Sequence, residues 1–146
     1  MSASDEDQDV YFYKVLKSAI HHPRIEKRRE MVYVLGELRD TRALAALETI
    51  MTEEDPFLVS EAVKAAGKIG GSRAIDLLLI MMHHPSFMVR GEVALAMGRI
   101  DHPNKYELLN QLLNDISPYV ANCANIALSR NDRRRICYGK RCRQIR

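Results

Sequence analysis

Apolar and polar positions alternate with the spacing of an α-helix along most of the chain. Between residues 56 and 69, Leu58, Ala62, Ala65 and Ile69 recur at steps of four, three and four residues, which places them on one helical face. No segment alternates with the period of two that a half-buried strand shows. The pattern predicts helices over about 9–21, 24–38, 42–51, 56–69, 73–83, 86–100, 104–114 and 117–129.

The helical pattern itself repeats every 31 residues. Three sets of equivalent positions share this interval: the glycines Gly36, Gly67 and Gly98; the leucines Leu16, Leu47, Leu78 and Leu109; and the helix-start residues Asp55, Ser86 and Ser117. A fixed period of this length indicates stacked repeats, none of which can bury its apolar stripe alone. The sequence therefore predicts an all-α fold, an α-solenoid of about four two-helix repeats.

Short polar residues mark the predicted helix starts. Thr41 and Ser72 are expected to cap the short helices of two repeats, and Asp55 to cap the long helix that begins at Pro56. In the last repeat Ser129 takes the glycine position, as expected of a polar unit that closes a stack.

Charge divides the 146 residues into three predicted regions. We expect an acidic disordered leader over 1–8, the solenoid over 9–130, and a basic C-terminal tail over 131–146. No apolar run reaches the roughly 18 uncharged residues of a membrane span, and the start lacks the pattern of a secretion signal. These features predict a cytoplasmic protein that does not bind membranes.

Three segments carry a resemblance to a known family: LGELRDTRAL from residue 35, DPFLVSEAVKAAGKIG from residue 55 and FMVRGEVALAMGRI from residue 87. Each resembles the short HEAT-like repeat of the phycobilisome-lyase type, and the resemblance covers about residues 10–130. It implies a two-helix solenoid whose longer helices line the concave side. Members of that family include bilin lyases, phycobiliprotein chaperones and many protein-binding scaffolds.

Relatives of this repeat type that hold a di-iron centre use His-Glu pairs as ligands. At the matching places this chain has Ser60-Glu61 and Gly91-Glu92, and no His-Glu dipeptide occurs anywhere. We therefore set a hydroxylase activity aside and expect no catalytic, metal or cofactor-binding residues.

A duplicated His-His-Pro occurs at residues 21–23 and 83–85, two repeats apart. At about 10 Å per helix layer, the two copies lie roughly 20 Å from each other, too far for one metal ion. We interpret them as equivalent helix ends.

The C-terminal tail combines two cysteines with many bases. Cys137 and Cys142 lack the second pair of a four-ligand metal site, so a redox pair, a site shared across a dimer and incidental thiols all stay open. The tail could bind an acidic protein or a nucleic acid, or it could only improve solubility. Its bases include Arg133, Arg134, Arg135, Lys140, Arg141 and Arg143.

Outward positions of the long helices form columns across the repeats. Glutamates at 30, 61 and 92 lie between an apolar column and a largely basic one, followed in register by Cys123, which we expect to be accessible. The glutamates either pair with nearby bases or orient a bound protein segment. The predicted partner-binding residues are Phe57, Glu61, Lys68, Met88, Glu92, Leu95 and Arg99.

Together these features predict a protein-protein interaction scaffold or adaptor rather than an enzyme, without a cofactor. Two alternatives stay open: a bilin lyase subunit or phycobiliprotein chaperone, from the family resemblance, and a nucleic-acid-associated protein, from the basic tail.

Overall fold

A computed structural model describes residues 3–130 of the protein, and all its regular structure is helical. The elements are α1 (Ala3–His21), α2 (Ile25–Leu38), the 3₁₀ turn η1 (Thr41–Ala43), α3 (Leu44–Met51), α4 (Pro56–Ile69), α5 (Ser72–Met81), α6 (Phe87–Arg99) and α7 (Lys105–Leu113). A last helix spans residues 118–130; we call it the C-terminal helix. None of the helices in this range is long and apolar enough to cross a membrane.

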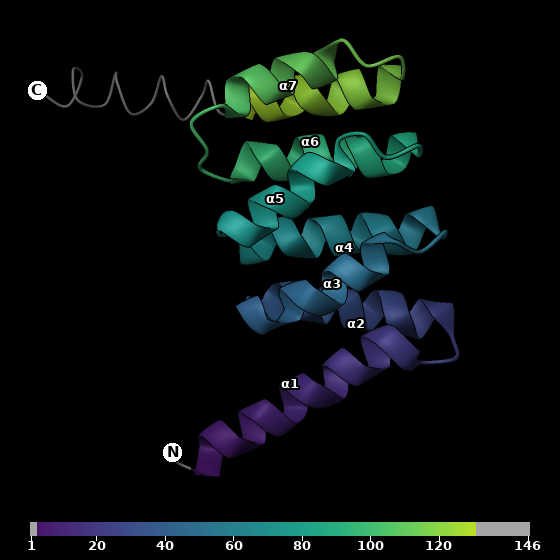
Figure 1. Ribbon diagram of the computed structural model, residues 1–146, viewed down its shortest axis with the longest axis vertical. Helices are drawn as coiled ribbons and strands as arrows, with labels where there is room; N and C mark the ends of the chain where they lie inside the picture. Colours follow the sequence, from purple (N-terminus) through teal and green to yellow (C-terminus); the bar gives the residue numbers. More distant parts are fainter. Residues whose placement is uncertain (1–2, 131–146) are drawn as a thin grey trace, which may run out of the picture.

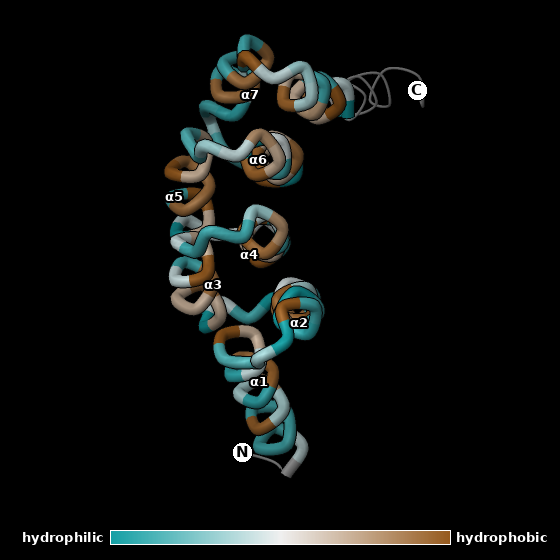
Figure 2. The backbone as a smooth tube through the Cα atoms, turned by 90° about the vertical axis from the view of Figure 1, so that its right-hand side faces the viewer, coloured by the Kyte–Doolittle hydropathy of each residue, from teal (hydrophilic) through white to brown (hydrophobic). Residues whose placement is uncertain are grey.

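The helices stack in chain order into an arc of two layers (Figures 1 and 2). The long helices α2, α4 and α6 form the inner layer on the concave side, while α3 and α5 form the outer layer. Each inner helix packs along the next, α2 on α4 and α4 on α6. The predicted all-α solenoid, with the long helices on the concave side, is confirmed.

The core runs continuously between the two layers. Leu47, Leu78 and Leu109, which occupy one position in successive repeats, are all fully buried, whereas Leu16 in the first repeat is only partly buried. One apolar cluster extends from α1 to the C-terminal helix. The stack therefore shares a single core, as the repeat interval requires.

Repeated glycines let the inner helices approach closely. A Cβ atom built on Gly36 would lie 2.9 Å from the Cα of Ala65, and one on Gly67 would lie 2.8 Å from the Cβ of Ala96. Both glycines are inside helices, where glycine lowers helix propensity by about 1 kcal/mol relative to alanine. The close contact between neighbouring repeats offsets this cost and explains why glycine recurs here.

The turns between helices use side-chain acceptors that the sequence only partly indicated. Asp55 accepts the backbone N–H of Phe57 at 2.9 Å, as expected of a helix cap. At the first short helix, however, Asp40 accepts the N–H of Arg42 at 2.9 Å, and Thr41 is the first residue of η1. Thr41 is thus not the cap, because the carboxylate one residue earlier takes this role.

Histidine side chains also accept backbone N–H groups in three His-Pro turns, in each case from the residue that precedes the next helix. The Nδ1 atom of His22, His84 and His102 accepts the backbone N–H two residues further on, at 3.1, 3.0 and 3.2 Å. The two His-His-Pro segments therefore occupy equivalent turns, one after α1 and one after α5, and His102 adds a third such turn. Ser86, predicted as a helix-start residue, makes no capping hydrogen bond with its own side chain.

Arginines join consecutive repeats at these turns. Arg28 pairs with Glu53 at 2.6 Å and donates from Nε to the carbonyl oxygen of Ala19 at 2.9 Å. Two repeats later, Arg90 takes the position of Arg28 and pairs at 2.8 Å with Asp115, which takes the position of Glu53. Both arginine side chains are largely buried, so these links belong to the framework of the stack.

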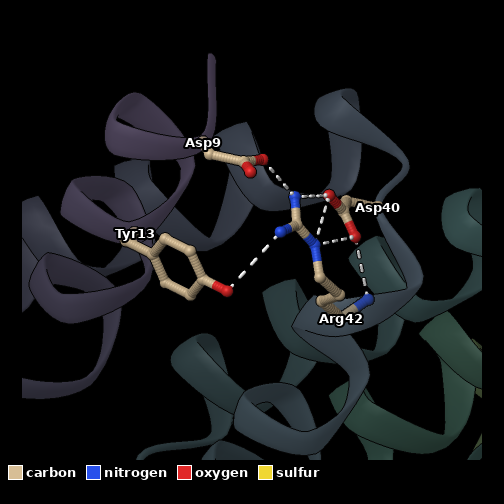
Figure 3. A network of polar contacts seen from close by, with 4 residues as sticks. All are labelled: Asp9, Tyr13, Asp40 and Arg42. Atoms are coloured by element: carbon tan, nitrogen blue, oxygen red, sulfur yellow. Dashed lines mark hydrogen bonds and ion pairs between the residues drawn. The ribbon is translucent and has the colours of Figure 1, made fainter. Parts of the chain in front are cut away.

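The first helix begins earlier than expected, because α1 includes residues 3–8. Arg42, at the start of the short helix of the next repeat, binds its acidic first half (Figure 3). Its guanidinium lies 3.0 Å from Asp9 and 2.6 Å from Asp40, with its carbon 4.5 Å from the centre of the Phe12 ring. These contacts connect the acidic segment to the solenoid.

The tail bases after residue 130, together with Cys137 and Cys142, lie outside the described residues. The interpretations that rest on them stay predictions.

Candidate functional site: the inner groove

A groove of about 300 Å³ opens on the concave side of the solenoid, centred on α4 and α6. We call it the inner groove. It is lined by Arg29, Phe57, Ser60, Glu61, Lys64, Met88, Glu92 and Tyr119.

Helix and repeat periods together bring these side chains to one place. On α4, residues 57, 60, 61 and 64 follow the three- and four-residue steps of a single helical face. On α6, Met88 and Glu92 lie 31 residues after Phe57 and Glu61, so the stacking of repeats sets the two pairs side by side. Arg29 of α2 and Tyr119 of the C-terminal helix complete the groove from the repeats on either side.

Two carboxylates in the groove face one amine. The Nζ of Lys64 lies 3.2 Å from Glu61 and 4.0 Å from Glu92. Among the described residues, Lys64 is the only base within ion-pair distance of either carboxylate.

Glu92 is the more buried of the two acids, with 18% of its side chain exposed. Burial raises the pKa of Glu92 above its ordinary value, against the opposing effect of the Lys64 charge. When water is removed from around a carboxylate, a nearby cation is attracted more strongly, because the charges are screened less. The groove therefore favours a positively charged group beside Glu92.

Two buried polar atoms of the groove lack a hydrogen-bond partner: the Oγ of Ser60 and the Nε of Arg29. Ser60 is only 8% exposed, and it is the one buried polar residue within 3–130. Arg29 binds Asp55 through its Nη2 at 3.1 Å and lies over the Phe57 ring, which leaves its Nε–H without an acceptor. Buried groups of this kind cost free energy unless they are paired, so a ligand that hydrogen-bonds them gains affinity.

Aromatic and apolar side chains form the rest of the lining. Phe57 is about half exposed, and Tyr119 stacks edge-to-face on Phe87 with ring centres 5.6 Å apart. The Tyr119 ring also covers Gly91, since a Cβ there would lie 2.4 Å from its Cε1 atom. Burial raises the pKa of both Tyr119 and the adjacent Cys123 thiol, so neither is poised to ionise.

The structure brings together four of the predicted partner-binding residues. Phe57, Glu61, Met88 and Glu92 line the inner groove. Outside its lining lie Leu95, Arg99 and Lys68, the last of which pairs with Glu37 at 2.5 Å and sits over the Tyr33 ring.

Four lining residues were not among the predicted site residues: Arg29, Ser60, Lys64 and Tyr119. Lys64 carried a signal in the sequence, because it is charged in a column that is otherwise Tyr33, Leu95 and Ile126.

The glutamate column does not act as one surface. Glu30 is exposed and pairs with Lys27 at 2.7 Å, outside the groove, whereas Glu61 and Glu92 share Lys64. Cys123 was expected to be accessible and is only 4% exposed, because it packs against Gly91 beneath Tyr119. That expectation is wrong, since it assumed that every repeat presents the same face at the end of the stack.

A second hollow, of about 370 Å³, lies between α1 and the turn after α2. Its central base, Arg42, is already bound by Asp40 and Asp9 (Figure 3), with the Tyr13 hydroxyl at 3.5 Å. This hollow therefore offers a ligand less than the inner groove does.

The groove does not fit the metal ligands of the di-iron relatives. Residues 3–130 contain no group of three or more His, Cys, Asp or Glu side chains that could hold a metal ion. The positions that would carry the ligand histidines hold Ser60 and Gly91, and the Tyr119 ring fills the space that a side chain at 91 would need. We therefore assign no metal-dependent step to these residues.

Comparison with known proteins agrees with the architecture. The family model described as HEAT repeats matches residues 13–96, which is more than half of the chain. The protein belongs to the HEAT-repeat family. The relatives support the HEAT-repeat family, but not specifically the phycobilisome-lyase type of repeat.

Curated proteins similar to this HEAT-repeat chain are deoxyhypusine hydroxylases. The mouse (Mus musculus) protein is 32% identical over 84 residues, covering 53% of this chain and 28% of the relative. The Drosophila melanogaster protein is 27% identical over 108 residues, covering 73% and 36%. Human deoxyhypusine hydroxylase in complex with glycerol has a similar fold, with a TM-score of 0.67 at 20% identity over 81% of this chain and 42% of that one. The chain thus spans less than half the length of the relatives it matches.

These relatives overturn the function predicted from the sequence. They are enzymes, so the scaffold or adaptor interpretation is wrong, and neither alternative, a bilin lyase or phycobiliprotein chaperone or a nucleic-acid-associated protein, is supported. The absence of a His-Glu dipeptide led us to set hydroxylases aside. The similarity to them lies in the repeat framework instead.

Proposed function

We propose that this HEAT-repeat protein binds a lysine-derived cationic side chain of the deoxyhypusine type in the inner groove, as a substrate-binding relative of deoxyhypusine hydroxylase. One observation carries the proposal: two carboxylates on adjacent inner helices, Glu61 and Glu92, flank a single alkylammonium group, that of Lys64.

The chemistry of deoxyhypusine matches the lining of the groove. Deoxyhypusine is a lysine side chain extended by an aminobutyl group, so it presents amines separated by methylene chains. The two carboxylates suit the amines, and the rings and thioether of Phe57, Met88 and Tyr119 suit the methylene chains. The unpaired Ser60 hydroxyl can accept a further N–H.

The role proposed here is binding, not oxidation. The names of the relatives support deoxyhypusine as the bound group, while the residues at positions 60 and 91 do not supply ligands for a metal. Glu61 would orient the side chain from α4, and Glu92 would neutralise its second charge from α6.

The test is isothermal titration with Nα-acetyl-deoxyhypusine amide. We expect the wild-type protein to bind it and the analogous norleucine amide not to bind, because norleucine has no amine. Glu61→Gln and Glu92→Gln should each weaken binding about tenfold or more, since each removes a charge-assisted hydrogen bond. Glu30→Gln is the matched control, because Glu30 occupies the same column outside the groove.

Spermidine distinguishes a protein-borne side chain from a free polyamine. Tighter binding of spermidine than of the deoxyhypusine amide would redirect the proposal to free polyamines. Equal binding by wild type and the Glu61→Gln/Glu92→Gln double variant would overturn it.

A further inference from the structure

Lys64 is out of place in the repeat pattern. The equivalent residues in the other repeats are Tyr33, Leu95 and Ile126, all apolar or aromatic. No repeat-to-repeat contact of the framework therefore requires an amine at this position. What the amine does contact is the pair of groove carboxylates, Glu61 and Glu92.

The contacts of Lys64 hold it loosely. It lies three residues after Glu61 on α4, so its amine bends back along its own helix to reach that carboxylate. The second contact, to Glu92, is 4.0 Å long, and about a third of the Lys64 side chain is exposed. Ion pairs as exposed as this contribute little to stability, because water screens them and the long side chain loses freedom when it is held.

We infer that Lys64 is a built-in competitor that occupies the amine position of the inner groove and sets which ligands can displace it. This inference rests on the proposed function. Lys64 offsets one of the two carboxylate charges, and its four-carbon stem lets the amine swing outward when a ligand amine arrives.

The consequence is selectivity for ligands with more than one amine. A ligand with a single amine would only replace Lys64, gaining one ion pair and losing another. A diamine of the deoxyhypusine kind can bind both carboxylates, and the second ion pair offsets the free energy lost when the Lys64 amine is displaced. Lys64 is thus a specificity-determining residue rather than a catalytic one.

The test compares wild type with Lys64→Met, which keeps an unbranched side chain of nearly the same length and removes its charge. For Nα-acetyl-lysine amide, which has one amine, we expect affinity to rise about fivefold in Lys64→Met, because the probe no longer competes with an internal amine. For Nα-acetyl-deoxyhypusine amide the rise should be smaller, about threefold. The control is Lys27→Met, which removes the amine of the Lys27–Glu30 pair away from the groove and should change neither affinity.

A second measurement uses the wild-type protein, so that it does not depend on a variant. The ¹³Cε resonance of Lys64 should shift as the deoxyhypusine amide is added, whereas that of Lys27 should not. The inference about Lys64 is wrong if Lys64→Met binds both probes with the affinity of wild type. It is also wrong if the ¹³Cε resonance of Lys64 in the wild-type protein stays unchanged when the deoxyhypusine amide saturates it. In either case the groove remains the binding site. If neither wild type nor Lys64→Met binds either probe, the proposed function fails and the inference fails with it.

Discussion

Gly67 and Gly91 both lie inside long inner helices and face the next repeat, yet they make different kinds of contact. Gly67 meets Ala96, and the same contact recurs one repeat earlier between Gly36 and Ala65. Gly91 meets the ring of Tyr119, and this contact has no counterpart in other repeats, where the equivalent residues are arginine, serine and asparagine.

The comparison separates framework from site. A feature that recurs every 31 residues is required by stacking, because every interface between repeats poses the same packing problem. A feature that occurs once is not explained by stacking. Here such features, Gly91 under Tyr119, Lys64 in an apolar column and the unpaired Ser60, all lie at the inner groove.

The strongest test of the repeated framework is Leu78→Ala. Leu78 is fully buried, as are its equivalents Leu47 and Leu109, so we expect the free energy of unfolding to fall by about 2–5 kcal/mol. Urea unfolding monitored by circular dichroism should still show one transition, because the core is continuous. Ile80→Ala on the same helix is the control, since Ile80 is 62% exposed and should change stability little. An unchanged midpoint for Leu78→Ala would mean that the repeats do not share this core.

Gly67→Val tests the repeated close contact. The added side chain would collide with Ala96, and overpacking of this kind costs about 1–3 kcal/mol. The second change Ala96→Gly removes the atom it meets, so the double variant should recover part of the loss in a double-mutant cycle. Strict additivity of the two changes would show that the helices do not touch there.

Gly91→Ala probes the contact that occurs once. The added methyl would push the Tyr119 ring from its position, and a side chain forced off its preferred rotamer costs about 0.5–1.5 kcal/mol. Because Tyr119 lines the inner groove, the affinity for Nα-acetyl-deoxyhypusine amide should also change. In the Tyr119→Ala background Gly91→Ala should instead raise stability, because the gain in helix propensity, about 1 kcal/mol, is no longer opposed by the ring. The same loss in both backgrounds would contradict the proposed contact.

We expect the smallest effect at two equivalent turns, which carry His84 and Asp115 at the same repeat position. Each accepts the backbone N–H two residues further on and contacts Arg90. Burial, aided by the Arg90 charge, lowers the pKa of His84, and the hydrogen bond from Arg90 lowers the pKa of Asp115.

Both shifts give stability that is present at neutral pH and lost on acidification, in different windows. The His84 contribution should fall as the pH drops below its unfolded-state value of 6.5, because burial and the Arg90 charge disfavour the protonated ring in the folded protein. The Asp115 contribution should persist until the pH drops below 3.8. His84→Asn keeps a hydrogen-bond acceptor that does not titrate. In this variant the free energy of unfolding should therefore depend less on pH between pH 7 and pH 5 than it does in wild type. An unaltered dependence in that variant would assign it to other groups.

The sequence by itself determined the helices, their order and their stacking. These follow from side-chain periodicity, and helical periodicity is a local property that survives in any arrangement that buries one face. The 31-residue interval then required equivalent interfaces, so Gly67 and Leu78 could be assigned to the framework before their contacts were known. Asp55 could be assigned as a cap for the same local reason, since its acceptor and the N–H it binds are two residues apart.

Only the tertiary structure decided how the inner groove is composed. The columns predicted Glu61 and Glu92 as neighbours, but the shared Lys64, the orphaned Ser60 hydroxyl and the burial of Cys123 depend on how closely α4, α6 and the C-terminal helix approach. That approach is set by packing across repeats, and it decides which of many outward side chains meet. Spacing along one helix carries no information about a neighbour's rotamer or about the water that packing removes, and the charge and binding capacity of the groove depend on both.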